Sequence, residues 1–347
     1  MTGNTPLVLI GSVELRRGIC KSGIRTLKFA IILGVIFFAL ECPADAQTRP
    51  ARIGVLGAPE EPRFSGIVSG LKQGLRDLGY AEQALEILEG RVERGKEKDR
   101  ERSVVEELAR KNAQVLFIMG SRLVRRARQV APTIPIVFIT PGDPVASGHV
   151  SSLSKPGNNT TALTFEYPEL SGKRLEILKE MVPRIRRVLA IYDPRDASPL
   201  QGLTAARETA PKLGITLLDR ETRSREDIGR ALEMLGKVDG FLGIPGGIPT
   251  GHYQAIIRAA NTKRTATIFH AHSGSTFEAL ASYGSSDTGI AREAARLIDK
   301  ILKGANAGEL PVERPTKLEL VINLKTAKQI GVTIPPNVLA RADKVIK

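Results

Sequence analysis

The stretch that most constrains the fold is residues 114–145, which joins two strand-like runs through one helix-like run. Residues 114–119 and 134–140 are rich in Val, Ile and Phe, as buried strands are. Between them, apolar residues recur at the spacing of one helix face, namely at Leu123, Val124, Ala127 and Val130. Because this connection is too long for a hairpin, the second strand is predicted to run parallel to the first.

The same alternation of strand and helix patterns recurs in both halves of the chain. Residues 150–164 interrupt it with Ser, Asn, Gly and Thr, which indicates a loop or a crossover between domains. The first half has strand patterns at 52–57 and 85–88 and helix patterns at 64–78 and 104–109, and a second series runs from 170 to 270. We therefore predict an α/β fold of two lobes, each a doubly wound parallel sheet flanked by helices.

The tail is predicted to return to both lobes. It has strand patterns at 280–283 and 317–323 and helix patterns at 290–302, 324–330 and 338–346. We predict lobe 1 to comprise residues 47–155 and 274–312, and lobe 2 to comprise residues 156–273 and 313–347. A chain that crosses more than once makes a hinge of several strands, which favours closure of the lobes around a ligand.

The first 46 residues have the layout of a secretory signal peptide. Basic residues precede an apolar run at 29–40, and Ala44-Asp45-Ala46 follows, so we expect cleavage after Ala46. A membrane anchor is the competing interpretation, but twelve apolar residues are fewer than the roughly 20 that span a bilayer. Cys20 and Cys42 would both be removed, and Glu41 disfavours a lipid-modified Cys42. The mature protein is thus predicted to be periplasmic and free of thiols.

The chain carries 51 basic and 37 acidic residues, a formal net charge of +14. Removal of residues 1–46 leaves 46 basic and 34 acidic residues, a net charge of +12. The basic residues are interleaved with acids, and the sequence has no DNA- or RNA-binding motif. We therefore interpret the charge as a solvated surface and expect no nucleic-acid partner.

Two predicted strand ends supply the candidate site. In open α/β sheets, ligands bind beyond the carboxyl ends of the strands, where helix N–H groups and turn residues meet. The first strand of the central stretch ends at Gly120-Ser121-Arg122, and the second ends at Gly142-Asp143-Pro144. Ser121 either only caps its helix or also holds a ligand carboxylate. Asp143 either only forms a turn or accepts a hydrogen bond from a ligand ammonium or hydroxyl.

Motifs for catalysis or cofactors are weak in this sequence. The Gly-rich loop at 243–251 lacks both nucleotide-binding patterns, and His270 with His272 has no third metal ligand at suitable spacing. A Gly-x-Ser-x-Gly motif occurs only in broken form, at 273–275. We predict a binding protein without cofactors rather than an enzyme.

Several phrases resemble one protein family: RIGVLG, GLKQGLRDLGY, IPIVFIT, GDPVASG, VSSLSKPGNN and the long PTKLELVINLKTAKQIGVTIPPNVLARADKVI. They resemble the ABC transporter substrate-binding proteins that include tryptophan- and other amino-acid-binding members. The resemblance runs from Arg52 to the C-terminus and implies a two-lobed periplasmic-binding-protein fold of type I, related to repressor effector domains. It implies ligand contacts at Gly57, Ala58, Ser121, Arg122, Asp143, Thr161, Thr164, Phe165, Asp193, Gly246, Tyr283 and Ser286.

The chain departs from this family at two acidic contacts. Tyr283-Gly284-Ser285-Ser286 stands where relatives read Tyr-Gly-x-Asp, with Asp287 one place late, and Gly246 stands where an acid is common. The resemblance implies an exported monomer that captures a small polar molecule, an amino acid or related carboxylate. It would deliver this ligand to an inner-membrane permease of an ABC importer. The alternative is a periplasmic sensor that presents its ligand to a membrane receptor.

Overall fold

The structure is a computed structural model that describes residues 50–57, 63–92, 97–119, 122–165, 168–195, 197–271 and 276–347. The predicted signal peptide, its cleavage site after Ala46 and both cysteines lie outside the described residues. In the part of the chain that is described, no helix combines the length and the apolarity needed to cross a bilayer.

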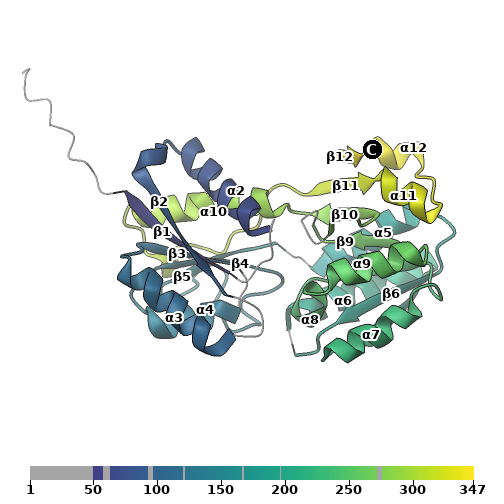
Figure 1. Cartoon of the computed structure of the whole chain (residues 1–347), viewed down its shortest axis with the longest axis horizontal. Helices are drawn as coiled ribbons and strands as arrows, with labels where there is room; N and C mark the ends of the chain where they lie inside the picture. Colours follow the sequence, from purple (N-terminus) through teal and green to yellow (C-terminus); the bar gives the residue numbers. More distant parts are fainter. Residues whose placement is uncertain are drawn as a thin grey trace, which may run out of the picture. The chain divides into compact units, whose positions relative to one another are not determined.

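The first sheet has five parallel strands in the order β2-β1-β3-β4-β5 (Figure 1). They are β1 (Ala51–Gly57), β2 (Leu85–Arg91), β3 (Val115–Met119), β4 (Ile136–Thr140) and β5 (Thr160–Thr164). The predicted unit at 114–145 is confirmed, because β3 and β4 pair in parallel and α4 (Arg122–Val130) connects them. Leu116 lies beside Ile136 in this pairing, and Met119 lies beside Ile139.

Side chains that alternate along these strands give the first sheet two buried faces. Val55 and Phe117 belong to a core with helices α2 (Arg63–Asp77) and α10 (Asp287–Leu302). Leu56 and Leu116 belong to a second core with α3 (Glu97–Arg110) and α4. Both faces are therefore apolar, as is usual for parallel strands that have helices on each side.

Helix α10 follows the second series of strands in the sequence, yet it packs against α2 (Figure 1). Glycines permit the close approach. A Cβ at Gly70 would lie 2.2 Å from the carbonyl oxygen of Thr288, and one at Gly74 would lie 2.3 Å from that of Arg292. The Arg292 Nε also donates to Asp77 Oδ2 at 2.6 Å. These contacts fix α10 to the first sheet.

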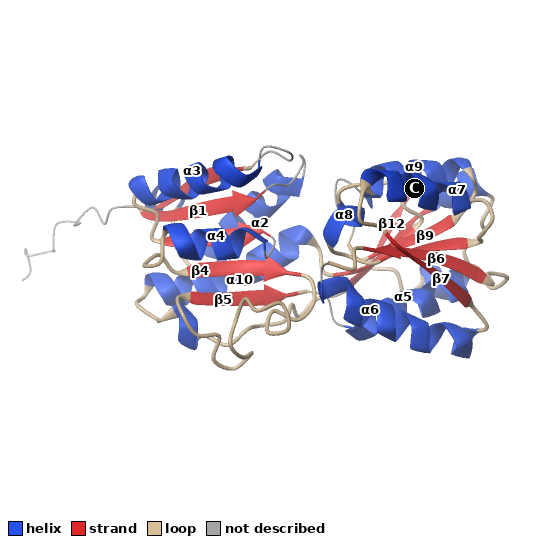
Figure 2. Ribbon diagram, turned by 90° about the horizontal axis from the view of Figure 1, so that it is seen from below, coloured by secondary structure: helices blue, strands red, loops and turns tan. Residues whose placement is uncertain are grey.

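The second sheet has the order β12-β11-β10-β9-β8-β6-β7. Its strands are β6 (Arg187–Tyr192), β7 (Thr216–Glu221), β8 (Gly240–Gly243), β9 (Ala266–Phe269), β10 (Ala281–Gly284), β11 (Glu319–Asn323) and β12 (Lys344–Ile346). Helices α5 (Pro168–Met181) and α6 (Ala197–Thr209) cover one face, and α7 (Arg225–Met234) and α9 (Tyr253–Thr262) cover the other (Figure 2). Helix α11 (Leu324–Ile330) packs on the same core as α5 and α6. The predicted fold class, sheets of mostly parallel strands flanked by helices, is confirmed.

Sheet membership differs from the predicted lobe boundaries at two strands. Residues 160–164 were predicted as a crossover and placed in lobe 2, but they form β5 and pair with β4. Their β-branched threonines suit a strand, and the polar Ser, Asn and Gly run ends at Asn159. Strand β10 was placed in lobe 1, but it pairs with β9 and β11. Hereafter lobe 1 means the first sheet with α2, α3, α4 and α10, and lobe 2 means the second sheet with its helices.

The tail also differs from its prediction. Residues 338–346 were predicted as one helix, but the structure has the short α12 (Pro336–Leu339) and then β12, parallel to β11. The Asp343 carboxylate accepts a hydrogen bond from the Leu320 N–H at 2.8 Å, and the β-branched Val345 and Ile346 continue the sheet. Strands β10 and β11 are antiparallel, so this sheet is not wholly parallel as predicted. The chain passes between the lobes after β5, after β10 and before β11.

Candidate functional site

The carboxyl ends of the lobe 1 strands carry part of the predicted site. Gly57 ends β1 and is buried, and Thr164 ends β5. Ala58 and Ser121 lie outside the described residues. Arg122 begins α4, but its side chain is not among those described. The pairing of β3 with β4 brings the end of β3 beside the turn that contains Asp143.

Asp143 forms a turn after β4. Its Oδ1 accepts hydrogen bonds from the N–H groups of Val145 at 2.7 Å and Ala146 at 3.3 Å. Its carbonyl oxygen accepts a hydrogen bond from the Ser147 hydroxyl at 2.9 Å. This is the turn role that an Asp before Pro commonly has. Its Oδ2 accepts no hydrogen bond from the described residues, so one oxygen of this half-buried carboxylate is available for a further role.

The two predicted threonine contacts on β5 have different surroundings. Thr161 is fully buried near the start of the strand, and its hydroxyl donates to the carbonyl oxygen of Leu310 at 2.8 Å. Thr164 lies at the carboxyl end, and its hydroxyl donates to the carbonyl oxygen of Gly142. Thr161 thus anchors the returning chain to β5, whereas Thr164 ties the end of β5 to the Asp143 turn.

Phe165 directly follows β5 and contacts a residue of lobe 2. Its ring stacks on that of His270, with ring centroids 5.9 Å apart and an angle of 23° between the planes. Both rings are almost fully buried. His270 follows β9, so this contact joins the carboxyl end of a lobe 1 strand to that of a lobe 2 strand.

Asp193 follows β6 and is paired with an arginine. Its Oδ1 accepts from the Arg195 Nε at 2.9 Å, and its Oδ2 accepts from the Arg195 Nη2 at 2.8 Å. These hydrogen bonds, and then the charge of Asp193, raise the pKa of Arg195. A paired carboxylate attracts a ligand ammonium less strongly than an unpaired one. The structure therefore gives Asp193 a partner within its own loop.

The loop after β8 presents backbone groups rather than an acid. Gly246 has φ +124°, a conformation that favours glycine, and its N–H donates to the Thr250 hydroxyl at 2.8 Å. The Tyr253 hydroxyl donates to the Ile244 carbonyl oxygen at 2.7 Å, and its ring lies 4.7 Å from that of Phe269. These contacts hold the end of β8 against the start of α9.

The end of β10 contains a buried arginine that the sequence interpretation missed. Arg174 of α5 is fully buried, and its Nε donates to the carbonyl oxygen of Tyr283 at 2.8 Å. A Cβ at Gly284 would lie 1.9 Å from the His270 carbonyl oxygen and 3.3 Å from Arg174 Nη2. Arg174 lies four residues from Leu170 and from Leu178, on the apolar stripe of α5. A basic residue on such a stripe is the signal that could have identified it.

The residues after β10 begin helix α10. Ser286, a predicted contact, caps this helix and accepts a hydrogen bond from the Gly289 N–H at 3.1 Å. The Ser285 hydroxyl is buried and has no hydrogen-bond partner among the described residues, which makes it available to a ligand. Asp287 is buried in the first turn of the helix.

The structure brings together some of the predicted contacts but not all of them. Phe165 and Tyr283 lie in one cluster with His270 and Arg174, at the ends of β5, β9 and β10. The Thr164 hydroxyl is hydrogen-bonded to Gly142, in the turn that contains Asp143. Thr161 is separate from these residues, and Asp193 is engaged by Arg195. His272 and residues 273–275, considered for metal binding and catalysis, lie outside the described residues.

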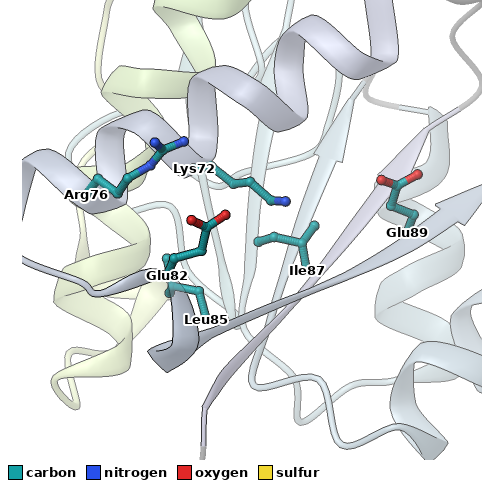
Figure 3. Close-up of a pocket in the computed structure, with 6 residues that line it drawn as sticks. All are labelled: Lys72, Arg76, Glu82, Leu85, Ile87 and Glu89. Atoms are coloured by element: carbon teal, nitrogen blue, oxygen red, sulfur yellow. The ribbon is translucent and has the colours of Figure 1, made fainter.

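A hollow at the edge of lobe 1 is a different feature. It lies between α2 and edge strand β2, where Lys72 and Arg76 face Glu82, Leu85, Ile87 and Glu89 (Figure 3). Its volume is about 100 Å³, below the roughly 300–1,000 Å³ of ordinary ligand pockets. Its lining lies along β2 rather than beyond the strand ends, so it does not correspond to the predicted site.

Three groups at the strand ends can contact a polar solute, namely the buried Arg174 guanidinium, the buried Ser285 hydroxyl and the Oδ2 atom of Asp143. The described ranges contain no group of three His, Cys, Asp or Glu side chains that could hold a metal ion. A family model for ABC transporter substrate binding proteins matches residues 52–346. The chain belongs to the ABC transporter substrate binding protein family. The resemblance inferred from its sequence motifs is thereby confirmed.

This substrate binding protein is similar to proteins from several bacteria. It is 22% identical over 279 residues to the tyrosine-binding protein of Clostridioides difficile strain R20291. This alignment covers 80% of each chain. A solved ABC domain from Streptococcus pneumoniae in complex with L-Trp has 22% identity and a TM-score of 0.73. A conserved domain protein from Vibrio cholerae has 27% identity and the same TM-score. Each structure matches 86% of this chain and 100% of its own, so the fold is shared.

Proposed function

We propose that this protein is the exported solute-binding component of an ABC importer. It captures a small polar molecule between lobes 1 and 2 and delivers it to an inner-membrane permease. The observation that carries the proposal is the family match over residues 52–346. The three passages of the chain between the sheets support it, because several linked segments at a hinge allow two rigid lobes to close on a ligand.

The proposed ligand is an amino acid or a related carboxylate. Two relatives support this class, since one is a tyrosine-binding protein and another is in complex with L-Trp. The buried guanidinium of Arg174 also supports it, because a cation beside the end of β10 favours an anionic group nearby. Phe165, whose ring stacks on that of His270, adds an aromatic side chain to the same cluster.

The proposed contacts differ in the strength of their support. Among acidic residues, we assign the contact with a ligand ammonium or hydroxyl to Asp143, because both Asp193 oxygens already accept from Arg195. We place Thr161 outside the contact set, since its buried hydroxyl is bonded to the Leu310 carbonyl. The remaining contacts stay in the proposal, namely Gly57, Ala58, Ser121, Arg122, Thr164, Phe165, Gly246, Tyr283 and Ser286.

Titration calorimetry with the twenty amino acids and their deaminated 2-oxo and 2-hydroxy acids tests this function. The proposal expects one compound to bind with a dissociation constant of about 10 μM or lower, equivalent to roughly 7 kcal/mol. Binding by an amino acid but not its deaminated analogue would support an ammonium contact. Absence of binding by every carboxylate, with binding by an uncharged solute instead, would overturn the ligand class.

The same proposal includes export and the absence of catalysis. Export rests on the charged, apolar and Ala-x-Ala order of residues 21–46. Mass spectrometry of protein recovered from the periplasm should show a chain that begins near Gln47 and contains no thiol. An intact apolar segment at 29–40 in that product would contradict it. Recovery of the bound ligand chemically unchanged after prolonged incubation is the corresponding test for a carrier.

A further inference from the structure

A basic cavity lies at the edge of lobe 1 where β4 and β5 begin. We call it the α4 cavity. Its lining comes from α4, from the turn before β4 and from the loop before β5, and consists of Arg125, Arg128, Gln129, Pro132, Asn158 and Asn159. It is an open depression with a volume of about 550 Å³. Helix α4 and these two strands can be followed in Figure 2.

The two arginines of the α4 cavity have no carboxylate partner in the part of the chain that is described. Arg125 is exposed and forms no hydrogen bond or ion pair with any described residue. Arg128 donates one hydrogen bond, to the His149 carbonyl oxygen at 3.3 Å, and forms no ion pair within the described ranges. By contrast, the Nε of Arg126, which does not line the cavity, lies 4.0 Å from Glu101 Oε2. Among the described residues that line the cavity none is acidic, so the charge of its arginines is not compensated there.

Side-chain amides add neutral hydrogen-bond donors to these cations. Gln129 Oε1 accepts from Arg126 Nη1 at 3.2 Å, which leaves the Gln129 amide nitrogen as a donor. Asn159 is held by its donation to the Ile134 carbonyl oxygen. Asn158 beside it adopts a left-handed backbone conformation, with φ +53°. Two guanidinium groups with amide donors, and no carboxylate, form a donor set suited to an oxyanion.

We propose that the α4 cavity binds a phosphate-bearing anion. Guanidinium forks match the geometry of phosphate oxygens, and the cavity is large enough for a phosphate joined to a further group. Such a group has two possible sources. It is either a soluble phosphorylated compound or the headgroup of an anionic phospholipid, and both present the same chemistry to Arg125 and Arg128.

This site is distinct from the proposed solute site and does not rest on it. Residues 158–159 precede β5, whereas Thr164 and Phe165 lie at its other end. The five residues of β5 separate the two edges by about 13 Å along the strand. Substitutions in the α4 cavity are therefore expected to leave solute capture unchanged, which makes solute affinity a control for correct folding.

The test compares four forms of the full mature protein. They are the wild type, R125Q, R125Q/R128Q and R184Q/R186Q, and the arginines of the last variant are exposed and form no side-chain ion pair with described residues. The control removes the same charge from lobe 2. Pyrophosphate binding is measured by titration calorimetry, and lipid binding by sedimentation with vesicles of phosphatidylglycerol and phosphatidylcholine. Ionic strength is held constant, because it screens exposed charges. R125Q alone is included because Arg128 also supports the His149 backbone.

The proposal predicts that R125Q/R128Q weakens binding about tenfold or more, that R125Q weakens it in part, and that R184Q/R186Q changes it less than about twofold. Saturable pyrophosphate binding would identify a soluble phosphate as the source, and binding to vesicles alone would identify a lipid headgroup. An equal loss of binding affinity in both double variants would overturn the proposal, because affinity would then depend on total charge rather than on this cavity. Binding to neither probe would also overturn it.

Discussion

Replacing Asp143 by Asn and by Ala separates the two roles that the structure allows for this carboxylate. Asn keeps an oxygen that can accept from the N–H groups of Val145 and Ala146, so the turn should persist. Ala removes that acceptor and leaves both N–H groups without it. If Asp143 also binds a cationic or hydroxyl group of the ligand, both variants should lose affinity but only Ala should lose stability.

The expected magnitudes follow from these contacts. Loss of the side-chain acceptor in D143A should cost about 0.5–2 kcal/mol of unfolding free energy, as loss of a helix cap does. D143N should stay within about 0.5 kcal/mol of the wild type. A hydrogen bond between the ligand and the charged oxygen is worth about 1.5–3 kcal/mol, so both variants should bind roughly 10- to 150-fold more weakly.

Urea denaturation and titration calorimetry on the same preparations measure both quantities. Binding of the ligand by D143N within about threefold of the wild type, a difference below 1 kcal/mol, would refute a ligand contact at Asp143. Asp143 would then be a turn residue only. D143N stability as low as that of D143A would instead show that the negative charge, rather than the acceptor, stabilises this turn.

Three further predictions concern packing, pH and motion. G70A should lower the unfolding free energy by more than about 2 kcal/mol, because its Cβ would lie 2.2 Å from the Thr288 carbonyl oxygen. G229A, in an exposed and open position of α7, should raise it by about 0.5–1 kcal/mol, and equal effects in urea denaturation would contradict the packing argument. Burial, and then the hydrogen bond to Asp299, raises the pKa of Tyr80 from 10.0 to about 12. Protonated Tyr80 therefore contributes to the free energy of unfolding below pH 10, and this contribution is lost as the pH rises towards 12. Y80F should remove this alkaline decrease in stability and the late step of the tyrosinate absorbance titration. An unchanged titration would contradict the raised pKa of Tyr80. Saturating ligand should reduce the radius of gyration in small-angle scattering, and a constant radius would count against lobe closure.

Much of the fold could be predicted from the sequence because apolar periodicity records buried faces. The unit at 114–145 was confirmed in strand direction and connection, since β3 and β4 are buried on both sides. Sheet membership was harder to predict. β5 was missed because its threonines continue a polar run, although pairing with β4 buries them fully. Local composition does not reveal a partner strand that lies elsewhere in the chain.

The place of the candidate site in the fold stays a prediction, and its detailed contacts could not be predicted from the sequence. Strand ends predict the edge at which a ligand would bind, and the structure brings Phe165 and the Tyr283 backbone into one cluster there. Sequence spacing could not show that Asp193 is paired with Arg195, or that Thr161 is bonded to the Leu310 carbonyl. Arg174 was missed because its contact with Tyr283 joins residues 109 positions apart. Such contacts depend on tertiary structure.

Native mass spectrometry of periplasmic protein that has never been unfolded tests solute capture most directly. We expect a non-covalent adduct with the mass of a small polar carboxylate, which is lost on unfolding and restored by the same compound after refolding. The adduct should be weaker in D143N and unchanged in R125Q/R128Q. Protein that carries no adduct, and gains none from the compounds that its relatives bind, would contradict the claim that this chain captures a small carboxylate.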